Sequence, residues 1–411
     1  MSSETVDQLW TVLPLLAAAL LLFEAIRTHR RLRRAIVPAA WPPRPPAYPP
    51  VSVIRPIRGL DHGAAENIRA ALQHGYPGEV ETLFVFDDEL EPALPLVRKA
   101  IAAMPPESQA PDDLNRARVV FAGAPPQRRT GKLNAMMAGL EHARHDLIVF
   151  ADSDIRPARG ALTALVDTLL AGPDVGSAFA PVVVTSPPET AGDAGYALLL
   201  NGLYAPAACQ VMGRSAGRSS FIMGQFMALR RAAIERIGGL RRLEGQLVDD
   251  MYLGELITRA GLRNQLSPQS VPVLQSGLDR RGFWRIYRRW VAFSSSGLHG
   301  GWGTVKGQAS WRGALFWLAL VVGAVAGAAG ELLAMAVAAV AALTVAWSLG
   351  VLHERVGGAR LKLRHRAMAL VVLIGGPWVF LSNVLDHDID WRGRSYRLDH
   401  GARLDLSRRP R

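Results

Sequence analysis

The chain has 411 residues, a formal net charge of +12 at neutral pH and a hydrophobic fraction of 49%. This length allows one sizeable globular domain with additional elements, and the single cysteine, Cys209, excludes an intrachain disulfide framework. A chain this basic and this apolar indicates an anionic lipid surface as a partner. Because the arginines cluster beside the apolar runs rather than on the globular part, nucleic acid is not expected as a partner.

An N-terminal apolar run predicts a membrane anchor within residues 1–36. The run covers residues 9–26 and is followed at once by arginines, namely Arg27, Arg30, Arg31, Arg33 and Arg34. A cleaved signal peptide carries its positive charges before the apolar stretch, and here the order is reversed. The positive-inside rule therefore places the residues after Arg27 in the cytoplasm. Seven prolines between Pro38 and Pro50 then predict a stiff, extended linker over residues 37–50.

The next segments alternate between strand-like and helix-like patterns. Strands are expected at residues 51–54, 81–86, 118–122 and 147–151, and helices at residues 63–72, 94–104 and 133–143. This alternation predicts an α/β domain with a mainly parallel sheet, which we place in the cytoplasm over residues 51–275.

Acidic residues follow two of the predicted strands. Asp87 and Asp88 come after the second strand, and Asp152 and Asp154 come after the fourth. In open α/β sheets ligands bind beyond the carboxyl ends of the strands, so both pairs are expected to face one crevice. One carboxylate there can bind a divalent cation while another faces a bound sugar nucleotide, whose departing diphosphate needs its charge neutralised.

Two further segments supply charged groups. Lys132 lies at the start of a predicted helix, where it can offset the charge of a pyrophosphate beside the helix N-terminus. An ordinary solvated basic turn is the alternative. Asp249 and Asp250 begin another apolar helix, and Asp250 is the candidate general base for an acceptor hydroxyl. Alternatively, the pair only caps the helix and favours its dipole, a role that we also consider for Asp249.

A basic amphipathic helix is predicted within residues 276–312. Its apolar residues recur at helical spacing and arginines fill the other face, namely Phe283, Ile286, Tyr287 and Trp290 against Arg281, Arg285, Arg288 and Arg289. This pattern is typical of a helix that lies in the membrane interface. It either only anchors the domain or also contributes Arg289 as a diphosphate contact and Trp290 as a wall of the acceptor site.

The remaining apolar runs predict membrane segments over residues 313–390. The run at 314–352 is too long for one span, since its 39 residues would make a helix of about 58 Å in a hydrocarbon core of about 30 Å. Two spans with Glu331 in the turn are therefore expected. The run at 367–385 contains Gly375-Gly376-Pro377, so a break there would make it re-entrant. The tail at 391–411 has seven arginines and two aspartates, and we expect it on the cytoplasmic side.

In this order the segments resemble the ceramide glucosyltransferases, glycosyltransferase family 21, within the family 2 group of GT-A enzymes. The similar motifs lie at residues 51–59, 84–92, 145–156, 224–250 and 286–290, and the tail at 391–396 is also similar to a family sequence. The resemblance implies a GT-A fold and gives each candidate a role. These roles are uracil or ribose binding by Asp88, donor contact by Asp152, Mg²⁺ or Mn²⁺ binding by Asp154, and general base catalysis by Asp250.

The resemblance implies a multi-pass enzyme of the inner (cytoplasmic) membrane. It would transfer glucose from UDP-glucose to a lipid hydroxyl of a ceramide-like acceptor with inversion. Two departures concern the acceptor: Ile286 stands where the family has Gln or Arg, and residues 183–222 match poorly. N-acetylglucosaminyl transfer to a hopanoid polyol or glucosylation of diacylglycerol therefore stays open. A processive polysaccharide synthase, for which four hydrophobic segments are few, and a non-catalytic membrane scaffold are the further alternatives.

Overall fold

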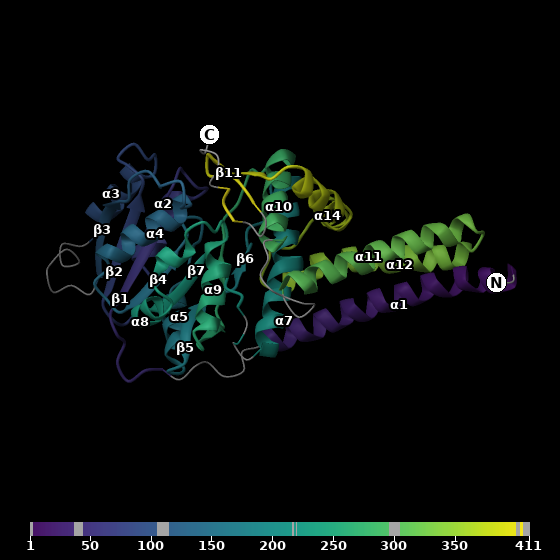
Figure 1. The fold of residues 1–411 in the computed structure, drawn as a ribbon, viewed down its shortest axis with the longest axis horizontal. Helices are drawn as coiled ribbons and strands as arrows, with labels where there is room; N and C mark the ends of the chain where they lie inside the picture. Colours follow the sequence, from purple (N-terminus) through teal and green to yellow (C-terminus); the bar gives the residue numbers. More distant parts are fainter. Residues whose placement is uncertain are drawn as a thin grey trace.

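The computed structural model describes residues 3–36, 44–104, 115–215, 218, 220–295, 305–399 and 403–405. Figure 1 shows a globular α/β domain, from which three long helices project as a bundle. The predicted proline-rich linker at 37–50 and the basic tail at 391–411 each lie partly outside the described residues.

A seven-stranded sheet forms the centre of the globular domain, in the order β3-β2-β1-β4-β7-β5-β8. Strand β7 runs antiparallel to β4 and β5, and the other neighbouring pairs are parallel. The strands are β1 (Val51–Pro56), β2 (Val80–Phe86), β3 (Asn115–Phe121), β4 (Leu147–Ala151), β5 (Val175–Phe179), β7 (Phe226–Arg230) and β8 (Arg263–Leu266). The α/β domain with a mainly parallel sheet, expected from the sequence, is confirmed.

Helices pack on this sheet and cover its apolar side chains. They are α2 (Ala64–Leu72), α3 (Leu94–Ala102), α4 (Gly131–His142), α5 (Ala161–Leu170), α8 (Arg231–Arg236) and α9 (Asp249–Arg259). Strands β1, β2 and β4 are almost entirely buried, which explains their continuous apolar sequences. Each element expected up to residue 151 is present, and its ends differ from the expectation by at most three residues. The short pair β6 (Val182–Val183) and β9 (Val271–Pro272) lies beside the sheet.

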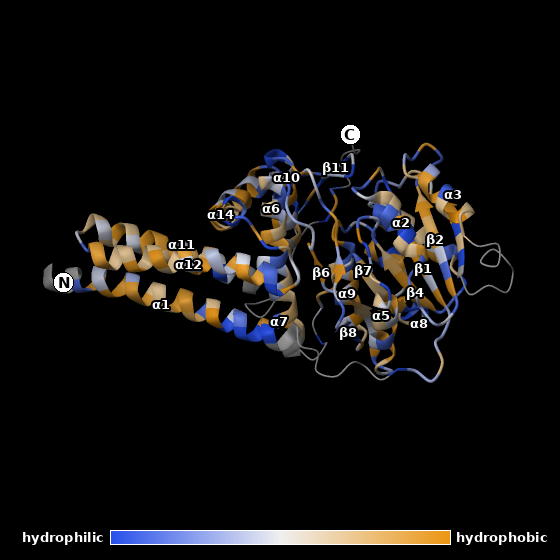
Figure 2. Cartoon of the chain, turned by 180° about the vertical axis from the view of Figure 1, so that it is seen from behind, coloured by the Kyte–Doolittle hydropathy of each residue, from blue (hydrophilic) through white to orange (hydrophobic). Residues whose placement is uncertain are grey.

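The projecting bundle consists of α1 (Ser3–Ile36), α11 (Val305–Ala328) and α12 (Leu332–Arg355). Many of its outward side chains are apolar and exposed, such as Phe23, Val340 and Leu343, and Figure 2 shows the bundle as mostly hydrophobic. A turn at Gly330 separates α11 from α12, and Glu331 directly precedes α12. Together with the segment Leu363–Leu385, these are four helices long and apolar enough to cross a membrane.

Helix α14 (Met368–Leu385) differs from the expected broken segment. It continues through Pro377 as one helix, and Figure 1 shows it at the base of the bundle beside α10, steeply inclined to the three long helices. Its glycines serve close packing instead of a break, since a Cβ at Gly375 would lie 3.2 Å from the Trp284 ring of α10. After α14 the chain returns to the globular domain. The described part of the tail therefore lies on the same side as the globular domain, while the orientation of both to a membrane stays a prediction.

Helix α10 (Arg280–Ser295) contains the predicted amphipathic pattern. Phe283 and Tyr287 are buried between the short helix α6 (Ala191–Ala197) and α14, and the Tyr287 hydroxyl donates to the carbonyl of Val372 at 2.6 Å. Contacts within the protein thus account for much of the apolar face of α10. A π-helix (Leu198–Tyr204) joins α6 to α7 (Ala205–Ser215) beside it.

Candidate active site

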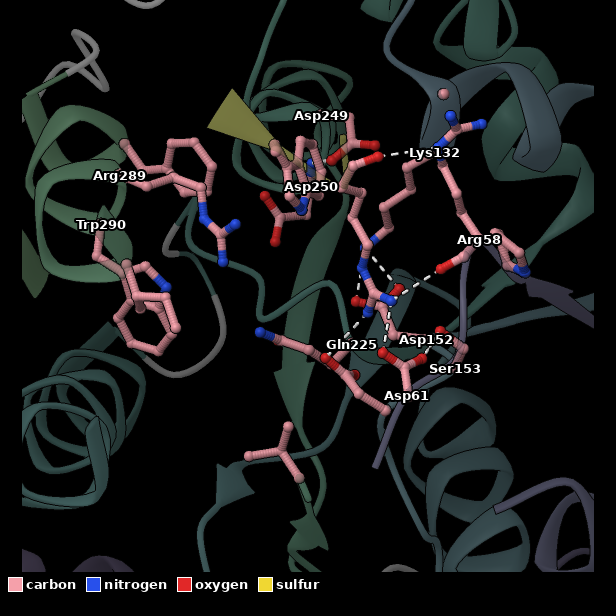
Figure 3. Close-up of a pocket in the computed structure, with 18 of the residues that line it drawn as sticks. Arg58, Asp61, Lys132, Asp152, Ser153, Gln225, Asp249, Asp250, Arg289 and Trp290 are labelled. Atoms are coloured by element: carbon pink, nitrogen blue, oxygen red, sulfur yellow. Dashed lines mark hydrogen bonds and ion pairs between the residues drawn. The ribbon is translucent and has the colours of Figure 1, made fainter. Parts of the chain in front are cut away.

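A cavity of about 620 Å³ lies at the carboxyl ends of β1, β2 and β4. Charged side chains of both signs line it. The carboxylates are Asp61, Asp87, Asp152, Asp154, Asp249 and Asp250, and the cations are Arg58, Lys132, Arg289, Arg392 and Arg394. Figure 3 shows Lys132 and Asp152 on one side of this cavity, Arg289 and Trp290 on the opposite side, and the Asp249–Asp250 pair between them.

Lys132 and Asp152 form an ion pair on one side of the cavity. The Lys132 Nζ atom lies 2.7 Å and 3.0 Å from the two carboxylate oxygens of Asp152 and 3.3 Å from the carbonyl of Gly224. The Thr130 side chain caps α4 and so fixes the turn that presents Lys132. Burial opposes the charge on Lys132, but Asp152, Asp249 and Asp250 outweigh it and raise the pKa above its usual range. Lys132 is therefore a permanent cation at this position.

Asp154 combines one paired and one unpaired oxygen. Its Oδ2 lies 3.4 Å from a guanidinium nitrogen of Arg392, whereas its Oδ1 is buried and has no hydrogen-bond partner among the described residues. Burial raises the pKa of Asp154 to about 6, with Arg392 opposing the rise and Asp152 and Asp61 adding to it. A buried oxygen without a donor fits a divalent cation. In the described part of the chain no three His, Cys, Asp or Glu side chains are grouped for a metal, so substrate oxygens and water would complete the coordination of a cation at Asp154.

Asp61 is a site residue that the sequence did not single out. Its carboxylate accepts from the Ser153 hydroxyl and from Arg392, each at 2.5 Å. It lies five residues after the end of β1, at the same edge of the sheet as Asp152. Its position shortly after a parallel strand, two residues beyond the motif at 51–59, is the signal that could have indicated it.

The two aspartates that follow β2 lie in different surroundings. Asp87 is buried and lines the cavity, where it pairs with Arg58 and, at 2.7 Å, with Arg394. Asp88 is exposed in a neighbouring hollow, and its Oδ1 accepts from the amide of Leu90 at 2.8 Å. Adjacent residues at a strand end face opposite ways, so Asp87 rather than Asp88 faces the main cavity. A nucleoside contact by Asp88 stays a prediction.

Asp249 and Asp250 begin α9 and both face the cavity. Asp250 accepts from the amides of Gly224 at 2.9 Å and Met251 at 2.8 Å, which fix its carboxylate in one orientation. Asp249 accepts from the amide of Asp250, and its Oδ2 is buried without a partner among the described residues. Burial raises the pKa of both carboxyls, that of Asp249 to about 6, while Lys132 opposes the rise.

Gly224 fits against Asp250 so closely that a side chain has no room. A Cβ at this position would lie 2.5 Å from both the Cβ and the Oδ2 of Asp250. If Asp250 is the predicted general base of glycosyl transfer, Gly224→Ala should displace its carboxylate and lower the rate of transfer by about 10²-fold, the cost of misplacing a reacting group. Single-turnover rates measure this effect. Gly313→Ala is the matched control, because a Cβ there meets nothing within 4 Å. Equal rates in both variants would contradict the positioning of Asp250 by Gly224.

Arg289 and Trp290 lie on α10 at the apolar side of the cavity. The Trp290 ring packs edge-on against Tyr196 and Tyr204, with ring centres 5.7 Å and 5.0 Å apart. Arg289 lies 5.7 Å from the centre of the Trp391 ring, and burial lowers its pKa. Its Nε has no hydrogen-bond partner among the described residues, so it can donate to a ligand. The structure thus brings six of the seven predicted site residues to one cavity.

The largest group that the sequence did not predict comes from the tail. Strands β10 (Asp388–Trp391) and β11 (Arg394–Arg397) form a hairpin near α10 (Figure 1). Its residues Trp391, Arg392, Arg394 and Tyr396 belong to the cavity lining. The sequence indicates only that residues 391–396 are similar to a family sequence.

Comparison with known proteins identifies the family. The model of glycosyl transferase family 21 matches residues 12–404, almost the whole chain. The chain belongs to glycosyltransferase family 21. Two ceramide glucosyltransferases of Caenorhabditis elegans, numbered 1 and 3, are 23% and 25% identical over 256 residues, which is 60% of this chain and 50% of each relative. The chain thus spans about half the length of these curated relatives.

A solved structure supports the predicted GT-A type fold. The mannosyltransferase PcManGT from Pyrobaculum calidifontis, solved with GDP-Man and Mn²⁺, superposes with a TM-score of 0.55 at 20% identity, over 90% of this chain and 99% of that one. At this identity the similarity concerns the fold. The predicted family and fold class are therefore confirmed. The roles of the individual residues stay predictions.

Proposed function

We propose that this family 21 chain transfers glucose from UDP-glucose to the hydroxyl of a ceramide-like membrane lipid and inverts the anomeric centre. The observation that carries the proposal is the shared cavity of Lys132, Asp154, Asp250 and Trp290, which combines charge for a diphosphate, a carboxylate base and an aromatic wall. The two nematode relatives are named ceramide glucosyltransferases, which supports the same substrate class.

The base is Asp250. Its raised pKa makes it a better proton acceptor than an ordinary carboxylate, and its two backbone hydrogen bonds fix it for attack. The acceptor oxygen loses its proton to Asp250 and forms the bond to the anomeric carbon. On the opposite face, the bond from that carbon to UDP breaks with its electrons passing to the diphosphate. Lys132 and Arg289 place positive charge beside this leaving group.

Asp154 is the proposed ligand of Mg²⁺ or Mn²⁺, because its buried Oδ1 is unpaired. When bound, the metal supplies further positive charge to the departing diphosphate, so the chain needs no separate catalytic acid. Asp152 holds Lys132 in place and is the proposed donor contact beside it.

The membrane helices fit a lipid acceptor. The cavity has a second, apolar part beside α10 and the π-helix, lined by Tyr204, Phe221, Ile222, Trp290 and Phe293. Helix α14, with its exposed Trp378 and Phe380, packs against α10 at this end. We propose that the chain lies in the cytoplasmic membrane, that α14 rests at the membrane surface and that the active site faces the cytoplasm.

The pH dependence of metal binding follows from Asp154. Its raised pKa means that it takes up a proton at higher pH than an ordinary carboxyl and loses its charge below about pH 6. We expect the affinity for Mn²⁺ to be constant above pH 7 and to fall about tenfold per pH unit below about pH 6. Electron paramagnetic resonance of free Mn²⁺ between pH 5 and 8 measures this. Affinity that improves at low pH, or that does not change, contradicts the assignment.

The experiment that tests the function is transfer of radiolabelled sugar by the full chain in lipid nanodiscs. Label from UDP-glucose in an extractable β-glucosylceramide supports the proposal. Label in a hopanoid polyol or in diacylglycerol would change the acceptor, and transfer only from UDP-N-acetylglucosamine would change the donor. A labelled polymer would indicate a processive synthase, and no transfer from any donor would indicate a scaffold.

A further inference from the structure

The tail hairpin β10–β11 makes ion pairs with carboxylates from three separate strand ends. Arg392 contacts Asp61 at 2.5 Å and Asp154 at 3.4 Å, and Arg394 contacts Asp87 at 2.7 Å. These partners are more than 200 residues away in the sequence. The hairpin thus brings two cations to the acidic edge of the sheet, where β1, β2 and β4 end.

The hairpin also covers the N-terminus of α4. The Tyr396 hydroxyl accepts from the amide of Gly131 at 3.2 Å, and a Cβ at Gly131 would lie within 2.0 Å of an Arg394 nitrogen. Free amides at a helix N-terminus favour anionic groups. Lys132 lies in the same turn. Arg394 and Tyr396 therefore stand beside the groups best placed for a diphosphate.

The charge balance of the cavity depends on the hairpin. Six carboxylates line the cavity, and of its five cations two come from the hairpin. Without Arg392 and Arg394 the remaining lining would carry a clear excess of negative charge, which repels a nucleoside diphosphate. With them the charges almost balance before any metal binds.

The backbone at the tip of the hairpin, which carries Arg392, has an unusual conformation. Arg392 has φ of 52° and is the one non-glycine residue with positive φ in the described part of the chain, and Gly393 follows at 73°. This conformation disfavours a residue with a Cβ, so it needs support from surrounding contacts. The support comes from Arg58, whose carbonyl accepts from Arg392 at 3.1 Å and whose Nε donates to the Arg392 carbonyl at 2.9 Å.

We propose that the hairpin β10–β11 is part of the donor site and that Arg392 and Arg394 bind the diphosphate of the nucleotide sugar, an inference that rests on the proposed function. In the donor-free state the two arginines pair with Asp61, Asp154 and Asp87. When the donor and its metal bind, the guanidinium groups exchange carboxylate oxygens for phosphate oxygens, which they contact in the same planar geometry.

The remainder of the hairpin can stay in place during this exchange. Within the hairpin, Trp391 packs against Phe293, with ring centres 6.2 Å apart. Beyond its last strand, the amide of Leu404 donates to the carbonyl of Gly245 at 2.8 Å. These contacts do not involve the two arginines. The buried Oδ1 of Asp154 has no hydrogen-bond partner among the described residues even with Arg392 in place, so the hairpin leaves this oxygen unpaired for a cation. The contacts therefore favour a hairpin that holds the donor, which we call a clamp, over a hairpin that blocks the empty site, which we call a plug.

The test measures binding of UDP, with Mn²⁺ present, to the full chain in nanodiscs by isothermal titration calorimetry. We expect Arg392→Ala to weaken UDP binding at least tenfold and Arg392→Lys to restore part of it. The matched control is Arg397→Ala on the same hairpin, because Arg397 pairs with Asp388 and Asp405 and does not line the cavity. Its UDP affinity should equal that of the wild type. Unchanged or tighter UDP binding by Arg392→Ala overturns the proposal, and tighter binding identifies a plug.

A second measurement uses the wild-type chain and does not depend on folding of a variant. Hydrogen exchange of the amides in β10–β11 should slow at least fivefold when UDP and Mn²⁺ are added, and faster exchange overturns the clamp. The outcomes also separate the two proposals. Wild-type transfer of glucose to lipid with normal UDP binding by Arg392→Ala refutes the clamp alone, whereas a wild-type chain that binds UDP but transfers nothing refutes the proposed reaction alone.

Discussion

Asp250→Asn is expected to lower the turnover of glycosyl transfer by about 10²–10⁴-fold, the usual contribution of a positioned general base. The amide cannot accept the proton of the acceptor hydroxyl. UDP binding should remain within about twofold of wild type, because Asp250 is held by the amides of Gly224 and Met251 rather than by the cationic groups beside Asp152. Single-turnover transfer and calorimetric UDP binding measure the two effects separately.

Asp249→Asn is the matched comparison, since it makes the same change in charge one residue away. Asp249 accepts from the amide of Asp250, so we expect a smaller loss that reflects a shift of its neighbour. If Asp249→Asn abolishes transfer while Asp250→Asn retains near-normal turnover, Asp249 is the base instead. Thermal unfolding of both variants checks that each chain is folded.

The sequence predicted the parts of the site that depend on strand order. Asp152 and Asp154 follow β4, and Lys132 lies at the start of α4. Local apolar patterns in the sequence predict both elements. Because the strands of a parallel sheet end at one edge, the three residues are expected to lie together there. The sequence could not choose between Asp87 and Asp88 from spacing alone. That choice depends on which face of the sheet each side chain takes at the end of β2, because neighbouring residues there face opposite ways.

The position of the hairpin β10–β11 in the tail could not be predicted from the sequence. Strands β10 and β11 are four residues long and mostly polar, and their positions depend on long-range contacts, with Asp61 after β1, Asp87 after β2 and Phe293 of α10, rather than on a local pattern. For Gly375 the local sequence predicted a feature that the structure does not have. A Gly-Gly-Pro sequence in an apolar run suggests a break, but its purpose here is close packing of α14 on Trp284 of α10.

Removal of divalent cations is expected to abolish transfer, with activity falling at least about 10³-fold after chelation and returning with Mg²⁺ or Mn²⁺. The reason is electrostatic: Asp61, Asp154 and the donor diphosphate are all negative, and inside the cavity their repulsion is stronger than in bulk water unless a cation lies between them. Activity against free metal concentration, with the metal fixed by a chelator buffer, measures this dependence.

The same titration separates the roles of the two acids that follow β4. Asp154→Asn should raise the metal concentration needed for half-maximal activity at least about tenfold, because it weakens the ligand whose Oδ1 is unpaired. Asp152→Asn is the matched control. It releases Lys132 from its 2.7 Å ion pair and should raise the donor KM while leaving the metal requirement unchanged. If instead Asp152→Asn shifts the metal requirement and Asp154→Asn does not, the cation belongs to Asp152, and Arg392 is then the permanent partner of Asp154 rather than one that it exchanges.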